Sequence, residues 1–195
     1  MQRNQMRWGP ALRLWTRPGR GKIQPMPHQP PMPAGRIVPG PGQESVWDFP
    51  RPPRVEPSAE RVVVGFAGQV LVDSTEAVRV LETSHPPVYY LLRSAFPGGA
   101  LVAAPGSSLC EFKGAARYLD LRLGETVARR AAWYYPEPWP GYEQLRERVA
   151  LFPAAMDSCE VDGEPVIPQE GGFYGGWITS RVVGPFKGGP GTLGW

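Results

Sequence analysis

The sequence has few of the features that identify metal proteins, membrane proteins and nucleotide-binding enzymes. It contains two cysteines and two histidines in 195 residues, without the paired spacing of a zinc site. It has no GxxxxGK[ST] phosphate-loop motif. No apolar run approaches the roughly 20 residues that cross a bilayer. We therefore expect no metal site and no membrane span, and the sequence names no cofactor.

The sequence offers few candidates for catalysis by histidine or cysteine. His85 precedes two prolines and has Ser84 beside it, which is a poor arrangement for a Ser–His–Asp triad, so we expect a turn residue there. The cysteines lack CxxC spacing, and the arginine-rich N-terminal stretch lacks the apolar segment of a secretory signal. These features indicate a reduced, cytoplasmic protein.

Basic residues are concentrated at the N-terminus. Residues 1–43 hold seven Arg or Lys and no acidic residue, which leaves 14 basic and 18 acidic residues in 44–195. The net charge of +3 therefore comes from the first segment, and the acidic remainder argues against a nucleic-acid surface. Residues 1–43 are also rich in proline. We expect them to be a disordered leader and residues 44–195 to form a single domain.

Three segments carry the pattern of a β-hairpin. "RVVVGFAGQVLVD", "LDLRLGETVAR" and "CEVDGEPVIP" each place two apolar or alternating runs around a turn glycine, at Gly68, Gly124 and Gly163. These hairpins predict a mainly β fold, a single compact antiparallel domain. One or two short helices are also expected. The first is over residues 73–82, where Asp73 and Glu76 form a capping pair, and the second is over residues 141–151.

The stretch "SLCEFKGAARYLD" predicts a strand, a bend and a second strand. Alternation from Ala116 sends Leu119 to the core and Tyr118 to the polar face. Cys110 is either a packed, inert thiol or a nucleophile. Lys113 is followed by small residues that let a ligand approach, so it could bind a phosphate or carboxylate as a point charge. The alternative for Lys113 is a surface lysine at a turn.

Aromatic residues gather in two further stretches. "AAWYYPEPWPGY" contains Trp133, and "VYYLL" contains Tyr89 and Tyr90. Part of this set must be core, and the rest would give the wall of a small-molecule site. Trp47, which lies among prolines, is either an anchor on the core or a wall of a ligand site or protomer contact.

Several blocks of the chain resemble a bacterial and fungal family known as domain of unknown function 427. They are "ESVWDFPRPPR", "VLETSHPPVYY", "CEFKGAARYLDL", "AAWYYPEP", "VALFPAAMD" and "GGFYGGWITSRVVGPFKGGPGTLGW", which together span about residues 43–195. The resemblance implies a β-tent-like structure and carries a nucleotidyltransferase-like label. The zinc knuckles of other β-tent proteins are not implied here, because the paired cysteines are missing. Many members have proline where this chain has Glu111.

The leading hypothesis is a β domain that binds a small anionic molecule. Lys113 would anchor the anion, Tyr118 would hydrogen-bond it, and Trp133 with Tyr89 or Tyr90 would form the apolar wall, with Cys110 beside them. One alternative is an enzyme acting on a phosphorylated or nucleotide substrate. Another is a protein-interaction module that binds a partner or a second protomer through the leader or the Trp47 segment. The ligand and the oligomeric state are not determined by the sequence.

Overall fold

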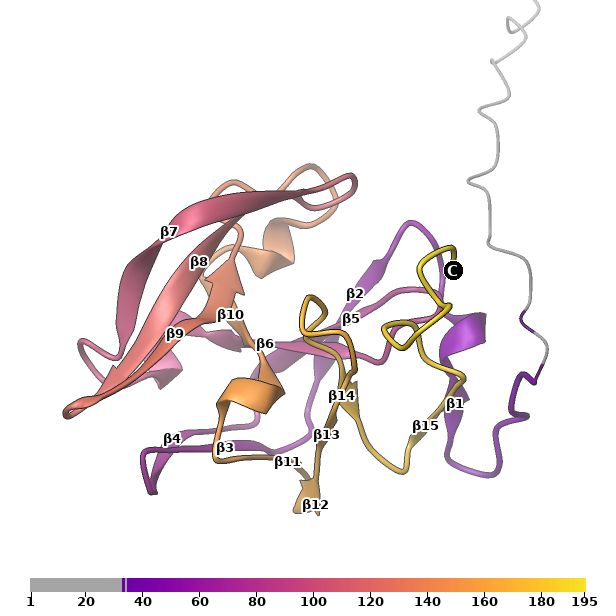
Figure 1. Cartoon of the computed structure of the whole chain (residues 1–195), viewed down its shortest axis with the longest axis horizontal. Helices are drawn as coiled ribbons and strands as arrows, with labels where there is room; N and C mark the ends of the chain where they lie inside the picture. The colour runs from indigo at the N-terminus through magenta and orange to yellow at the C-terminus, as the bar shows by residue number, and fades with distance from the viewer. Residues whose placement is uncertain (1–32, 34) are drawn as a thin grey trace, which may run out of the picture.

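The computed structural model describes residue 33 and residues 35–195, and its largest element is a seven-stranded antiparallel sheet (Figure 1). Most strands that are neighbours in this sheet are also consecutive along the chain, so most of the sheet is built from hairpins. In spatial order the strands are β2 (Arg54–Ser58), β5 (Ala77–Leu81), β6 (Val88–Leu92), β10 (Arg148–Leu151), β9 (Thr126–Tyr134), β8 (Gly114–Leu123) and β7 (Leu101–Cys110).

Three smaller sheets complete the described part of the fold. A four-stranded antiparallel sheet has the order β12 (Glu164–Pro165), β11 (Ser158–Val161), β3 (Val62–Phe66) and β4 (Gln69–Ser74). The pair β13 (Ile167–Pro168) and β14 (Trp177–Ile178) is antiparallel. The pair β1 (Glu44–Ser45) and β15 (Val182–Val183) is parallel. The helices are single 3-10 turns: η1 (Val46–Asp48), η2 (Arg93–Ala95), η3 (Glu143–Leu145) and η4 (Pro153–Ala155).

The three predicted hairpins are confirmed. Gly68, Gly124 and Gly163 connect β3 to β4, β8 to β9 and β11 to β12. Their φ angles are +70°, +57° and +81°, a backbone region that glycine enters without steric cost. The predicted strand, bend and strand around Lys113 are confirmed as well, as β7, a turn and β8.

The predicted helix over residues 73–82 is wrong, because this segment is the end of β4 followed by β5. Ala77 lies in the core on one face of the seven-stranded sheet, while Val78 and Val80 lie on the other. A strand that is buried on both faces does not alternate apolar and polar residues. The spacing of its apolar residues therefore resembled the apolar stripe of a helix. The helix expected over residues 141–151 is the 3-10 turn η3 followed by strand β10.

The seven-stranded sheet separates two apolar clusters. One cluster, which we call the inner core, lies between this sheet and the four-stranded sheet and contains Val64, Leu119, Leu151 and Trp177. The opposite face carries a second cluster, which includes Tyr90. Because successive residues of a strand point to opposite faces, the two faces of the sheet carry different side chains.

Trp47 is an anchor on the fold, as one of the two readings of the sequence expected. It is 6% exposed, its indole N–H donates to the carbonyl of Pro185 over 2.8 Å, and its ring centroid lies 5.3 Å from that of Trp195. Of the expected leader, residues 1–32 and 34 lie outside the described residues. Within residues 35–43, the amide of Ile37 donates to the carbonyl of Gly184 over 3.2 Å.

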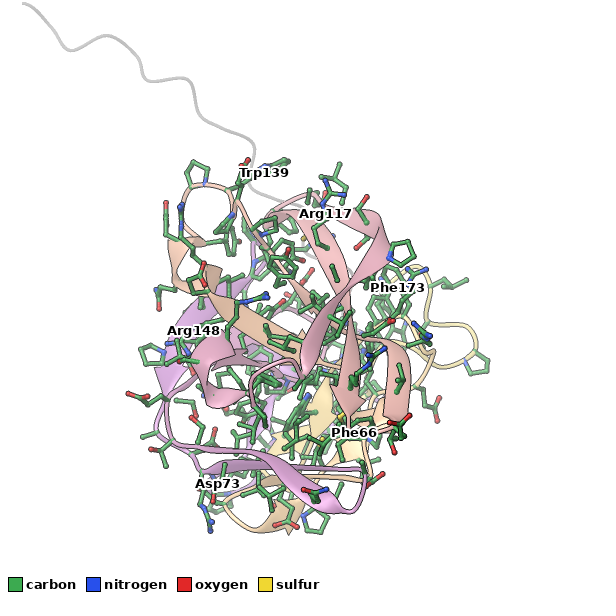
Figure 2. The ribbon with its side chains drawn as sticks, turned by 90° about the vertical axis from the view of Figure 1, so that its left-hand side faces the viewer. Phe66, Asp73, Arg117, Trp139, Arg148 and Phe173 are labelled. Atoms are coloured by element: carbon green, nitrogen blue, oxygen red, sulfur yellow. The ribbon has the colours of Figure 1, made fainter. Side chains whose placement is uncertain are left out.

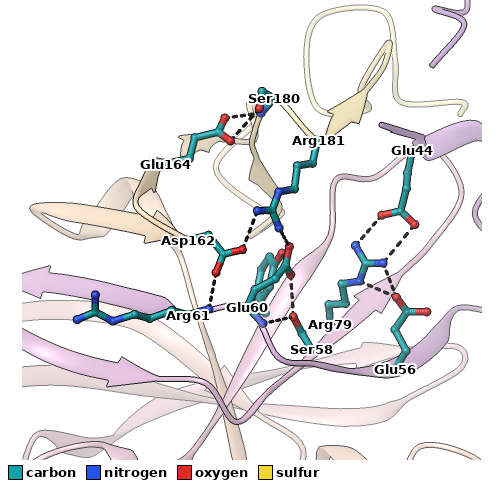
Figure 3. A network of polar contacts seen from close by, with 11 residues as sticks. Glu44, Glu56, Ser58, Glu60, Arg61, Arg79, Asp162, Glu164, Ser180 and Arg181 are labelled. Carbon is teal, nitrogen blue, oxygen red and sulfur yellow. Dashed lines mark hydrogen bonds and ion pairs between the residues drawn. The ribbon is translucent and has the colours of Figure 1, made fainter. Parts of the chain in front are cut away.

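A polar network holds the first and last strands against the sheets (Figure 3). Arg79 of β5 forms ion pairs with Glu44 of β1, at 2.6 Å, and with Glu56 of β2. Arg181 bonds Glu60 and, over 2.7 Å, Asp162. No helix in the described part of the chain has the length and apolar character needed to span a bilayer.

Two leucines of the β7–β8 hairpin differ in burial, so we expect their substitution to have different effects on stability. Leu121 is fully buried, whereas Leu109 is 73% exposed. We expect Leu121→Ala to lower the free energy of unfolding by about 2–5 kcal/mol, since it leaves a cavity in the inner core. Leu109→Ala should change it by less than about 0.5 kcal/mol. Urea unfolding of both variants measures the difference, and equal losses would contradict the difference in burial between the two leucines.

Candidate functional site

A cavity of about 380 Å³ opens beside the Tyr90 face of the seven-stranded sheet. Its lining residues run from Arg51, before β2, to Lys187 near the C-terminus, so it assembles parts of the chain that are far apart in sequence. Its charged residues are Arg51, Glu82, Glu111, Lys113 and Lys187. Its aromatic residues are Tyr90, Phe112, Tyr118, Trp133, Tyr135, Phe152, Phe173 and Tyr174, and His85, Cys110 and Gln169 also line it.

Five of the six residues singled out in the sequence line this one cavity: Tyr90, Cys110, Lys113, Tyr118 and Trp133. The sixth, Tyr89, does not. It lies in the inner core, where its hydroxyl donates to Glu60 over 2.6 Å and its ring centroid lies 5.3 Å from that of Trp177. Adjacent residues of a strand point to opposite faces, so Tyr89 and Tyr90 could not both line the same cavity.

The turn between β7 and β8 places Cys110 and Lys113 at the cavity together. Gly114 has a φ of +98°, and a Cβ on it would lie 2.9 Å from the ring of Trp139, so glycine allows the ring to close over the turn. Trp139, labelled at the edge of the molecule in Figure 2, also donates its amide to the carbonyl of Lys113 over 3.1 Å. The lysine side chain is only 10% exposed. The alternative of a surface lysine is therefore wrong.

The cations of the cavity outnumber their buried counter-ions. Lys113 and Arg51 share the carboxylate of Glu82, each at 3.4 Å. Arg51 also bonds Glu111 over 2.6 Å, but that side chain is 64% exposed at the rim. Lys187 donates to a main-chain carboxylate oxygen of Trp195, the last residue of the sequence, and no Asp or Glu carboxylate of the described residues lies within 4.0 Å of its ammonium. Burial lowers the pKa of Lys187, and the charge of Arg51 lowers it further.

Gln169 fixes the protonation of His85. The amide N–H of Gly176 donates to Oε1 of Gln169 over 3.1 Å, so the other end of the side chain is the NH2 group. That group donates to the carbonyl of Lys187 over 2.6 Å and lies 3.1 Å from Nδ1 of His85. Nδ1 is therefore the acceptor and the proton of the neutral ring is on Nε2. Burial lowers the pKa of His85 to about 4, which agrees with a neutral ring.

The aromatic wall is held by contacts among its own members. The indole N–H of Trp133 donates to the hydroxyl of Tyr90 over 3.1 Å, and its ring centroid lies 4.5 Å from that of Phe152. A Cβ on Gly175 would lie 2.2 Å from the Trp133 ring, so the indole packs directly on that backbone. Burial raises the pKa of Tyr90 and of Tyr135, so both phenols are neutral near pH 7.

Sequence reasoning missed Arg51, Gln169 and Lys187 as residues of the cavity, and it treated His85 only as a turn residue. His85 does lie in a turn, between β5 and β6, and it also lines the cavity. A signal for Lys187 was present. The tripeptide Phe-Lys-Gly occurs at residues 112–114 and again at 186–188, and both of its lysines line the cavity. For Gln169 the sequence carries no comparable signal.

The two thiols have different environments. Cys110 is partly exposed and lines the cavity, whereas Cys159 is buried in the inner core, where burial raises its pKa to about 12. Within the described residues, no group of three or more His, Cys, Asp or Glu side chains could hold a metal ion.

A model of the family described as "Domain of unknown function (DUF427)", with the label NTP_transf_9, matches residues 54–162. This match covers more than half of the chain. It contains Glu82, Lys113 and Trp133, while Arg51 and Lys187 lie outside it. A comparison with proteins of curated function found no match.

The exposure of the thiols predicts selective alkylation. In the native protein, iodoacetamide should modify Cys110 and leave Cys159 unmodified, because a buried thiol with a raised pKa forms little thiolate. Intact mass should show a single adduct, and peptide mapping should place it at Cys110. In Cys110→Ser no adduct should form until the protein is unfolded. Modification of Cys159 in the native wild type would contradict the described core.

The burial of His85 predicts a pH effect on stability. Its pKa is about 4 in the fold against 6.5 for an exposed histidine, so between these values the unfolded chain binds a proton that the folded chain does not. As the pH falls from 6.5 to 4, this group should lower the free energy of unfolding by up to about 3 kcal/mol. Urea unfolding across this range should show a smaller loss in His85→Gln. Parallel profiles, or an NMR titration of His85 near 6.5, would contradict it.

Proposed function

The chain belongs to the family described as domain of unknown function DUF427, a description that states no activity, and we propose that its cavity binds a small anionic molecule with a flat apolar part. The observation that carries the proposal is the excess of cations. Lys113 and Arg51 share the carboxylate of Glu82, and Lys187 is paired with no Asp or Glu of the described residues but only with the main-chain carboxylate of Trp195. Partly buried cations without full compensation are costly, and a bound anion would offset that cost.

The wall and the size of the cavity support the second half of the proposal. A volume of about 380 Å³ is within the range of small-molecule sites. Trp133 and Tyr90 supply flat apolar surface in the same cavity as Lys113. His85 has its Nδ1 bonded by Gln169, so its ring could offer a ligand only the Nε2 proton, as a neutral donor. A ligand with an acceptor next to its anionic group fits these chemical features.

Catalysis is the weaker proposal for this cavity. A general base works best when its pKa is near the operating pH, whereas the pKa of His85 is about 4 and Gln169 occupies its Nδ1. Cys110 keeps nucleophilic catalysis as an alternative, since it lines the same cavity as three cations. The family label refers to nucleotide transfer, so nucleoside triphosphates belong among the ligands to be tested.

Ligand binding should stabilise the wild type and depend on the cavity lysines. We would measure thermal unfolding with aromatic carboxylates, aryl phosphates and nucleoside triphosphates, each beside its neutral amide or alcohol analogue. A ligand at 100 times its Kd adds about 2.7 kcal/mol, which raises the Tm of a protein of this size by about 5–10 °C. Lys113→Met and Lys187→Met should each reduce this shift by more than half, because they remove a charge and keep the apolar stem.

Arg54→Ala is the matched control. Arg54 is an exposed cation on β2 that does not line the cavity, so this variant should keep the full shift. If neutral analogues stabilised the protein as well as the anions did, or if Lys113→Met and Lys187→Met kept the full shift, the proposal would fail. In that case the protein-interaction module would become the leading hypothesis, and the next experiment would be a search for protein partners.

A further inference from the structure

A second cavity, of about 410 Å³, adjoins the first. The two share part of their lining, namely Tyr118, Phe152, Gln169, Phe173 and Tyr174. Phe173 and Tyr174 belong to the loop between β13 and β14, and their ring centroids lie 5.2 Å apart. The two spaces are therefore neighbours that share walls, and side chains of one loop are among those walls.

Two cations that do not line the first cavity, Arg129 and Arg130, line the second one. The guanidinium carbon of Arg130 lies 4.2 Å from the ring centroid of Tyr118, which lines both cavities. No carboxylate of the described residues lies within 4.0 Å of its guanidinium nitrogens, whereas the neighbouring Arg129 is paired with Asp120 over 2.6 Å. Arg130 is an exposed residue that lines the second cavity, and its charge is not paired with an Asp or Glu of the described residues.

The backbone holds Arg130 in this place at a conformational cost. Its φ is +49°, a region that non-glycine residues rarely occupy. The amide of Arg130 donates to Oδ1 of Asp120 over 2.8 Å, and the Asp120 side chain is 7% exposed. The guanidinium packs near Gly106 of β7, where an added Cβ would lie 3.8 Å from it. Strain of this kind is found at ligand sites, where the surrounding contacts enforce it.

We infer that the bound molecule is elongated and carries a second anionic group, a carboxylate or a phosphate, which Arg130 holds in the second cavity. This inference rests on the proposed function, because Lys113 and Lys187 would hold the first anionic group. A guanidinium presents paired N–H donors that match the two oxygens of a carboxylate or phosphate. The flat middle of the molecule would pass along Tyr118, the wall that both cavities share.

The test compares ligands with one and with two anionic ends. The probes are phenylalkanoic acids with zero to four methylene groups, each paired with the analogue that carries a second carboxylate para on the ring. Calorimetry gives the Kd of each probe for the full chain. In the wild type, the best diacid should bind at least tenfold more tightly than its monoacid. In Arg130→Asn this ratio should fall to near one while the Kd of the monoacid stays unchanged.

Asparagine is chosen because it tolerates a positive φ, so the variant keeps the backbone of residue 130. Arg122→Asn is the control, since Arg122 is exposed on the same hairpin and lines neither cavity. It should leave the ratio intact. A ratio near one in the wild type at every length, or a ratio that Arg130→Asn preserves, would overturn the second subsite while monoacid binding upheld the first. Failure of every monoacid and diacid to bind would overturn both proposals.

Discussion

The hydrogen bonds of the buried Gln169 side chain determine how the loops around the cavity meet. This amide is 5% exposed and connects Gly176, Lys187 and His85, which come from three separate segments. A Cβ on Gly176 would lie 2.3 Å from its oxygen, so the backbone must approach here without a side chain. A buried amide left unpaired costs about 1–3 kcal/mol, and satisfying it therefore favours this one arrangement of the loops.

The two faces of the seven-stranded sheet have different surroundings. The inner face packs on the four-stranded sheet through a cluster of buried apolar and aromatic side chains. The outer face carries Tyr90 and the cavity, where charged groups lie among aromatic rings. Tyr89 and Tyr90 illustrate the difference, since one contacts Glu60 and the inner core and the other contacts Trp133.

The charge of the cavity arises from segments that the sheet connections bring together. Arg51 precedes β2, Glu82 follows β5, Lys113 lies in the β7–β8 turn and Lys187 follows β15. Away from the cavity, the ion pairs of Arg79 and Arg181 hold the terminal strands in place (Figure 3). Sequence patterns find residues by local composition and spacing, so Lys113 and Tyr118 were predicted together, whereas Arg51, Gln169 and Lys187 were not.

The sequence by itself determined the β class, the hairpins at Gly68, Gly124 and Gly163, and the aromatic and basic residues of one cavity wall. These features depend on local rules, the φ angles open to glycine and the alternation of side chains along a strand. Only the tertiary structure decided that residues 77–81 form a strand, because burial on both faces hides the strand period. It also decided that Lys187 joins Lys113, since contacts between distant segments depend on how the sheets pack and not on local preference.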